Sequence, residues 1–170
     1  MSGRSTDSET RDHSPMETYS KATETRGLNG LPPNPYNPLA WVIGEPEIGE
    51  GVWIGAFTLI DGSGGLKIGA GVNISSGAQL VTHSSARRTV TERQYPHVDR
   101  APIEIGAHTF IGTNAVILMG SRIGHHSMVA AGAVVREGSE FPPYSVIAGV
   151  PAIRKAEVRW RPEQPGADSE

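Results

Sequence analysis

Histidines are the first candidates for chemistry in this sequence, because its 170 residues include six of them and no cysteine. Without cysteine there is no thiolate nucleophile, no disulfide framework and no thiolate metal site. His83 stands apart, since a regular spacing of aliphatic residues stops at Leu80, just before it, and resumes only at Ile105. Imidazole exchanges its proton near neutral pH, so His83 is a candidate general base. Position alone leaves a solvated loop histidine as the alternative.

The regular spacing is clearest from Ile105 to Val135, where the sequence repeats in sixes. On an α-helix a step of six turns a side chain through about 240°, so the aliphatic residues would scatter over several faces. In extended structure all of them point the same way, with a small residue five places into each hexad. The pattern predicts a narrow prism of short strands, in which each coil pairs with the next. The aliphatic positions are Ile105, Ile111, Ile117, Ile123, Val129 and Val135, and the small ones are Thr109, Ala115, Ser121, Ser127 and Ala133.

The same count runs backwards through Val42, Ile48, Ile54 and Ile60 and, after two extra residues, through Ile68, Ile74 and Leu80. About twelve hexads at three per coil give roughly four coils, enough for repeats that bury their faces against one another. We therefore predict an all-β fold, a parallel β-helix over residues 42–140, with a polar, basic loop projecting at 84–102. A disordered tail (1–30), a Pro-rich lead-in (31–41), a C-terminal cap (141–160, helical from Ala152 to Trp160) and a flexible tail (161–170) complete the predicted organisation.

Composition excludes several classes of function. The formal charge of −3 gives no electrostatic footprint for nucleic acid. No apolar run is long enough for a membrane span, and the N-terminus lacks the hydrophobic core of a signal peptide. We expect a single cytoplasmic domain.

Three features together resemble the hexapeptide-repeat acyltransferases: the hexads, the loop preceded by Val81-Thr82-His83, and the ending from Pro142 to Ala152, which reads PPYSVIAGVPA. Within that family the chain looks most like the sugar O-acetyltransferases, of the galactoside and maltose acetyltransferase type and their polysaccharide-biosynthesis relatives. The resemblance covers about residues 42–154. It implies a left-handed coil, a homotrimer, acetyl-CoA in the groove between neighbouring prisms, and His83 as the catalytic base.

Asp61 is the second candidate. Counting one coil and the two extra residues places it one rung below Val81 and two positions from His83. A carboxylate there could accept a hydrogen bond from the acceptor, and the resemblance implies an acidic acceptor-binding residue in this region. An aspartate in a glycine-rich turn is the alternative.

The resemblance also implies a cofactor site. Small residues let a pantetheine arm lie against the backbone, and Thr113 stands where relatives carry a hydroxyl that helps to stabilise the oxyanion. The chain departs from the family at Phe110, where relatives usually have Trp, and at Arg136-Glu137, where they favour Thr-Lys. The alternatives are a packed aromatic ring at Phe110, a turn threonine at Thr113 and a solvated basic tail at Arg154 and Lys155. The candidate cofactor-binding residues are Phe110, Thr113, Ala131, Gly132, Arg136, Arg154 and Lys155.

The other histidines of the hexads, His108, His125 and His126, fall at outward turn positions, so we expect them to be solvated. Some hexapeptide proteins, the γ-class carbonic anhydrases, bind zinc through histidines between subunits. Thr113 and Leu118 occupy the corresponding ligand positions here, so we expect no metal.

Arginines are frequent in the projecting loop. In a trimer this loop could wall a neighbour's acceptor pocket, and its charge would suit a phosphorylated or nucleotide-linked sugar. A solvated loop with Glu92 and Asp99 as counterions is the alternative. The residues concerned are Arg87, Arg88, Arg93, Tyr95 and Arg100.

The sequence thus predicts an acetyl-CoA-dependent O-acetyltransferase acting on a hydroxyl of a sugar or saccharide. With no cysteine and no evident Ser-His arrangement, the acceptor should attack the thioester directly. N-acetylation of an amino sugar or nucleotide-linked amino sugar, and a non-catalytic trimeric scaffold, are the alternatives.

Overall fold

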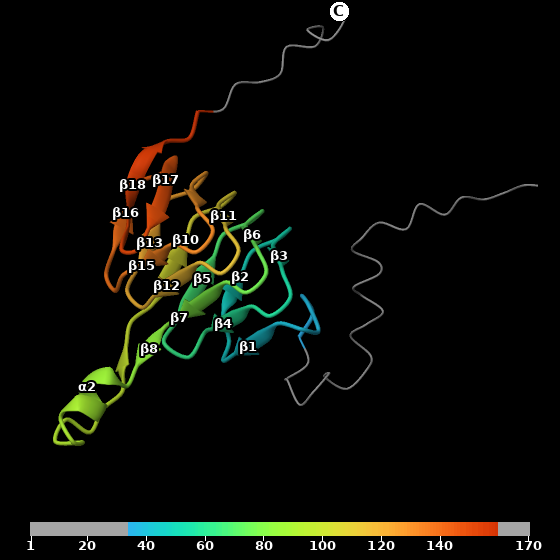
Figure 1. Ribbon diagram of the computed structural model, residues 1–170. Helices are drawn as coiled ribbons and strands as arrows, with labels where there is room; N and C mark the ends of the chain where they lie inside the picture. The colour runs from blue at the N-terminus through green and yellow to red at the C-terminus, as the bar shows by residue number, and fades with distance from the viewer. Residues whose placement is uncertain (1–33, 160–170) are drawn as a thin grey trace, which may run out of the picture.

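The computed structural model describes residues 34–159, so the predicted tails at 1–30 and 161–170 lie outside the described residues. Short parallel strands wind around one axis and form a three-sided prism (Figure 1). The prism is the parallel β-helix expected for hexapeptide repeats. No helix among residues 34–159 is long and apolar enough to cross a membrane.

Each side of the prism is one sheet with strands drawn from successive coils. The A face contains β1 (Trp41–Ile43), β4 (Leu59–Asp61), β7 (Gln79–Val81), β12 (Val116–Leu118) and β15 (Val134–Val135). The B face contains β2 (Glu47–Ile48), β5 (Leu66–Ile68), β10 (Ile103–Ile105), β13 (Arg122–Ile123) and β16 (Glu140–Phe141). The C face contains β3 (Trp53–Ile54), β6 (Asn73–Ile74), β11 (Phe110–Ile111), β14 (Met128–Val129), β17 (Ser145–Gly149) and β18 (Ala152–Glu157).

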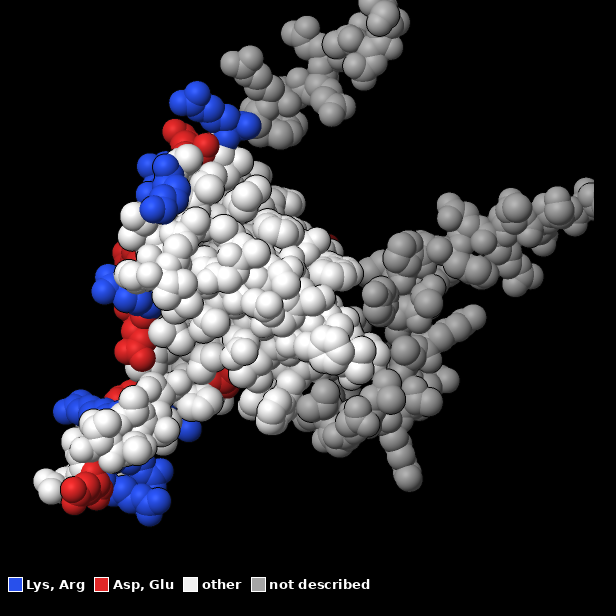
Figure 2. Space-filling model, viewed as in Figure 1, with Lys and Arg blue, Asp and Glu red and all other residues white. Residues whose placement is uncertain are grey.

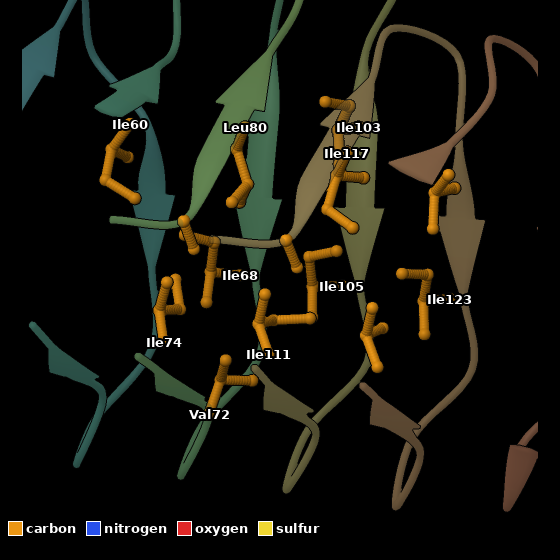
Figure 3. Packing of buried hydrophobic residues seen from close by; sticks show 14 of the residues in the cluster. Ile60, Ile68, Val72, Ile74, Leu80, Ile103, Ile105, Ile111, Ile117 and Ile123 are labelled. Carbon is orange, nitrogen blue, oxygen red and sulfur yellow. The ribbon is translucent and has the colours of Figure 1, made fainter. Parts of the chain in front are cut away.

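The core is made largely of the predicted aliphatic residues, which stack in three columns, and also includes Leu66, Val72 and Ile103 (Figure 3). On the A face, for example, Ile60 pairs with Leu80, Leu80 with Ile117, and Ile117 with Val135. These four side chains are fully buried, and burying one such side chain contributes about 1.5–3 kcal/mol. The small residues predicted at the fifth place of the hexads are buried as well: Thr109, Ala115, Ser121, Ser127 and Ala133.

The β-helix is longer than the sequence predicts. After Val135, β16 and β17 continue the parallel pairing on the B and C faces. The predicted boundary at residue 140 is therefore wrong, and the prism has about one coil more than the expected four. The hexad pattern is weaker there, but each strand needs only one large apolar residue facing the core. Phe141 and Ile147 supply these residues.

The predicted C-terminal helix is wrong. The segment Ala152–Glu157 is the strand β18, which pairs antiparallel with β17 along its length. Ala, Lys and Glu favour a helix intrinsically. The last strand of the coil, however, presents a row of backbone groups, and an added strand satisfies them.

The projecting segment has more structure than the predicted loop. The strands β8 (His83–Ser84) and β9 (Asp99–Arg100) pair antiparallel and carry the short helix α2 (Ala86–Val90) at their far end (Figure 1). The Arg87 guanidinium lies 3.9 Å from the centre of the Tyr95 ring. The Tyr95 hydroxyl donates a hydrogen bond of 2.8 Å to Asp99. These contacts shape residues 83–100, called the arm below.

The three outer faces differ in polarity. Charged side chains gather along one edge of the body and on the arm, while the broad side turned to the viewer carries almost none (Figure 2). On the B face the outward residues of paired strands are all charged: Glu47, Lys67, Glu104, Arg122 and Glu140. On the other two faces the exposed large side chains include Trp41, Trp53, Phe110 and Met128. The B face is thus suited to water, and the A and C faces are suited to contact with other protein surfaces.

Candidate active site

The site is built where the coil gives rise to the arm. Asp61 is the last residue of β4, and His83 is the first residue of β8, one coil further on. Because Leu80 lies over Ile60, the chain beyond β7 passes directly above Asp61. The Nδ1 atom of His83 lies 2.6 Å from Oδ2 of Asp61. The counting that placed Asp61 near His83 is confirmed.

The Asp61 carboxylate is fully buried and accepts hydrogen bonds from several donors. Oδ1 accepts a hydrogen bond from the backbone N–H of Ser63. Oδ2 accepts from the backbone N–H of Thr82, and the Thr82 hydroxyl lies 2.9 Å from the same oxygen. Burial alone raises the pKa of Asp61, but hydrogen bonds from Ser63, His83 and Thr82 outweigh it and hold the pKa well below its usual range. Asp61 is therefore an anion at neutral pH.

Glycines after Asp61 make this close packing possible. A Cβ at Gly64 would overlap the carbonyl oxygen of Thr82, and one at Gly62 would overlap Pro46. The backbone N–H of Gly64 donates to the Thr82 hydroxyl over 2.8 Å. The glycine-rich turn that the sequence offered as an alternative explanation for Asp61 thus lets Thr82 pack closely beside the carboxylate.

The arrangement fixes the ring of His83. An ionised carboxylate can only accept, so Nδ1 carries the hydrogen and donates it to Asp61. The other ring nitrogen, Nε2, is then an acceptor, and the His83 side chain remains 42% exposed. A histidine with one nitrogen bound to a buried carboxylate and the other free is arranged to remove a proton from a bound group. The donors around Asp61 leave its carboxylate no exposed surface, so we propose that it orients His83 rather than binding the acceptor.

Three of the predicted cofactor residues lie together on the corner between the C and A faces. Gly132 donates a backbone hydrogen bond of 2.9 Å to the carbonyl of Thr113, which stacks the two positions in successive coils. Thr113, Ala131 and Gly132 are all exposed. A Cβ added at Gly132 would meet nothing within 4 Å, so this corner presents bare backbone to whatever lies against it.

The remaining predicted cofactor residues are more dispersed. Phe110 projects from the C face and is partly exposed. Arg154 and Lys155 lie on β18, where the Nε of Arg154 donates to the hydroxyl of Ser145 over 3.1 Å. Arg136 follows β15 and lies on the corner between the A and B faces, the same corner as His83 but not that of Thr113. The structure therefore does not bring Arg136 to the other cofactor candidates.

His108, His125 and His126 are exposed at outward turns, as the sequence predicts. They lie on the corner between the B and C faces, where the His126 ring stacks on Tyr144 with 5.2 Å between centroids. Within residues 34–159, no group of three or more His, Asp or Glu side chains is placed to hold a metal ion.

Thr82 and Ser63 were missed by sequence reasoning as members of the site. The available signal was the same count that found Asp61: a residue one rung above a buried carboxylate has its N–H and side chain within reach of it. Thr82 is part of the motif Val81-Thr82-His83, but the resemblance assigned a role only to the histidine of that motif.

Comparisons with known proteins agree with this architecture. A family model described as bacterial transferase hexapeptide (six repeats) matches residues 102–137. The solved structure of the hexapeptide-repeat acetyltransferase VCA0836 from Vibrio cholerae is 31% identical, with a TM-score of 0.60; the match covers 67% of this chain and 63% of that one. A structure of VCA0836 with acetyl-CoA, from Vibrio cholerae O1 biovar eltor, is 32% identical, covering 67% and 61%, with a TM-score of 0.58.

A third similar structure is AntD, an N-acyltransferase from Bacillus cereus in complex with dTDP and 3-hydroxybutyryl-CoA. It is 21% identical, covers 73% of this chain and 69% of that one, and has a TM-score of 0.63; at this identity it supports the fold alone. The search of curated proteins found no match. The repeats, the coil and the similarity to VCA0836 support assignment of the chain to the hexapeptide-repeat acyltransferase family. The chain spans less than two thirds of the length of VCA0836.

The low pKa of Asp61 gives a stability prediction. An unfolded aspartate titrates near 3.9, whereas folded Asp61 stays ionised to lower pH. The carboxylate therefore stabilises the fold fully above about pH 5, and this contribution declines as the pH falls below about 4. Urea unfolding should show Asp61→Asn less stable than the wild type at pH 7, by a margin that shrinks in acid. Glu140→Gln, which changes an exposed carboxylate on the B face, is the control. A margin that is independent of pH would contradict the ionised, hydrogen-bonded state of Asp61.

Proposed function

We propose that this protein transfers an acetyl group from acetyl-CoA to a hydroxyl of a sugar or saccharide. The observation that carries the proposal is the pair formed by His83 and the buried anion Asp61, in which the His83 side chain stays 42% exposed and its second ring nitrogen has no hydrogen-bond partner among residues 34–159. The similar protein VCA0836 is described as an acetyltransferase and has been crystallised with acetyl-CoA, which supports the choice of acyl donor.

In the proposed reaction, Nε2 of His83 takes the proton of the acceptor hydroxyl. At the same time the hydroxyl oxygen attacks the carbonyl carbon of the thioester. The imidazolium is stabilised by Asp61, whose carboxylate lies 2.6 Å from Nδ1. The exposed hydroxyl of Thr113 is the candidate donor to the developing oxyanion. The tetrahedral intermediate expels the thiolate of CoA, and His83 returns the proton to it. Atoms and charge balance without an acyl-enzyme.

N-acetylation of an amino sugar remains the alternative within the same site. An amine is a better nucleophile than a hydroxyl and needs a base less, so the two differ in their dependence on His83. Release of CoA measured with matched hydroxyl and amine acceptors separates them. Binding of acetyl-CoA without turnover on any acceptor would instead favour a scaffold.

The assembly that fits this function is a homotrimer. His83 lies on the corner between the A and B faces, whereas Thr113, Ala131 and Gly132 lie on the corner between the C and A faces. The base and the cofactor surface of one chain are thus on different corners of its prism. A neighbouring prism can bring its own corner against the arm, and the apolar A and C faces are suited to such packing.

The first prediction of this proposal concerns His83→Ala. A positioned general base contributes about 10²–10⁴ in rate, so kcat should fall by that factor while the affinity for acetyl-CoA is kept. The measurement is CoA release under saturating substrates, with equilibrium binding of acetyl-CoA alongside. His108→Ala, an exposed histidine on another corner, is the matched control and should retain full turnover. Equal activity of both variants would remove His83 from the mechanism.

A second prediction concerns the 3′-phosphate of CoA. If Arg154 and Lys155 contact it, the double change Arg154→Gln, Lys155→Gln should raise the KM for acetyl-CoA about tenfold through lost charge-assisted hydrogen bonds. The KM for the acceptor should stay the same. Acetyl-dephospho-CoA should be used equally by variant and wild type. Arg122→Gln on the charged B face is the control; a wild type that does not distinguish the two donors would show that these residues do not recognise the phosphate.

A third prediction concerns the oligomer. Light scattering at micromolar concentration should give the mass of three chains, because two apolar faces and a divided site require neighbours. A monomeric mass with full acetyl transfer would contradict a site shared between subunits.

A further inference from the structure

Thr82 is fully buried between the arm and the glycine turn. Its hydroxyl accepts a hydrogen bond of 2.8 Å from the backbone N–H of Gly64. The same hydroxyl lies 2.9 Å from Oδ2 and 2.9 Å from the carbonyl oxygen of Asp61. One hydroxyl hydrogen can serve only one acceptor at a time. Of the two, the anionic Oδ2 is the stronger acceptor, so the hydroxyl donates to it and joins the turn to the Asp61 carboxylate.

The Thr82 hydroxyl and His83 are linked through the same carboxylate oxygen of Asp61. The contacts run from the Gly64 N–H to the Thr82 hydroxyl, from there to Oδ2 of Asp61, and from Oδ2 to Nδ1 of His83. Oδ2 is thus shared between Thr82 and His83, while Oδ1 is held by the backbone of Ser63. A carboxylate with both oxygens engaged cannot rotate about its χ2 angle without losing hydrogen bonds inside the protein.

We propose that Thr82 is a positioning residue for the acetyl transfer, which sets both the orientation of Asp61 and the strength of its interaction with His83. The inference rests on the proposed function, because it assigns Thr82 a part in the activity of His83. It adds a residue that contacts no substrate and acts through the carboxylate.

Charge explains the second part of this role. A hydrogen bond to a carboxylate spreads its negative charge, so each donor on Oδ2 weakens the attraction of that oxygen for a protonated ring. Removing the Thr82 hydroxyl leaves more negative charge facing His83, which strengthens the attraction of Asp61 for the imidazolium. Arg100 lies opposite His83 on β9, and its charge is the same with and without the hydroxyl. The effect of a Thr82 variant on the pH dependence therefore reports on Asp61.

The test compares Thr82→Val, which has nearly the same shape but no hydroxyl, with Thr82→Ser, which keeps it. Thr58 supplies the matched control: it is equally buried, and its hydroxyl donates 2.6 Å to the carbonyl of Gly55, away from His83. Both threonine-to-valine changes remove one buried hydroxyl from a corner of the coil. Both should lower the melting temperature, so stability alone does not distinguish the roles.

Three measurements distinguish a positioning role of Thr82 from a purely structural one. In Thr82→Val the kcat should fall about tenfold, as expected for one lost hydrogen bond to a charged group, with an unchanged KM for acetyl-CoA. Its pH–rate profile should move to higher pH. The Nδ1–H proton of His83, observed by nuclear magnetic resonance of histidine-labelled protein, should change its chemical shift. Thr82→Ser should resemble the wild type in all three, and so should Thr58→Val at temperatures where it is folded.

The outcomes separate this inference from the proposed function. A Thr82→Val protein with the wild-type profile and the wild-type Nδ1–H resonance would overturn the inference, and so would equal effects of Thr82→Val and Thr58→Val. If His83→Ala keeps full turnover, the proposed function fails, yet the resonance of His83 still shows whether Thr82 controls its contact with Asp61.

Discussion

The vertical pairing of the coils is the constraint on which the rest of the structure depends. Each strand pairs in parallel with the strand one coil away, in a register fixed by buried aliphatic residues such as Ile60, Leu80 and Ile117. A slip of one residue would turn these side chains outward, at a cost of several buried groups. Because the register cannot slip, a residue at the end of one strand has a defined neighbour in the next coil. The contact between Asp61 and the segment Thr82-His83 follows from that geometry.

The same constraint separates the chemical groups of one chain. A coil with three short sides places consecutive corners on different edges of the prism, so the arm and the bare backbone at Gly132 face different directions. In the proposed function, the buried anion beneath the arm and the open backbone surface on the next corner are the two components of the site for acyl transfer. In this account, assembly of copies brings them together, and the charged B face remains toward water.

Most of the coil could be predicted from the sequence, because one aliphatic residue in six and one small residue per hexad are each demanded by burial. The proximity of Asp61 to His83 followed from the same count. The strand β18 could not be predicted in this way, since Ala152–Glu157 has helix-favouring residues and only the unpaired edge of β17 makes it a strand. The same count places Thr82 beside Asp61, but the hydrogen bonds of Thr82 and Gly64 required the structure, because they depend on which atoms meet across the coils.

The central claim is that Nε2 of His83, with Nδ1 bound to Asp61, removes a proton from an acceptor next to the thioester. The most direct measurement is a crystal structure of the assembled protein with CoA. The account predicts that the CoA sulfur faces Nε2 of a His83, from the same or a neighbouring chain, with room for one acceptor oxygen about 3 Å from that nitrogen. CoA bound with its sulfur on a surface that no His83 faces would contradict it.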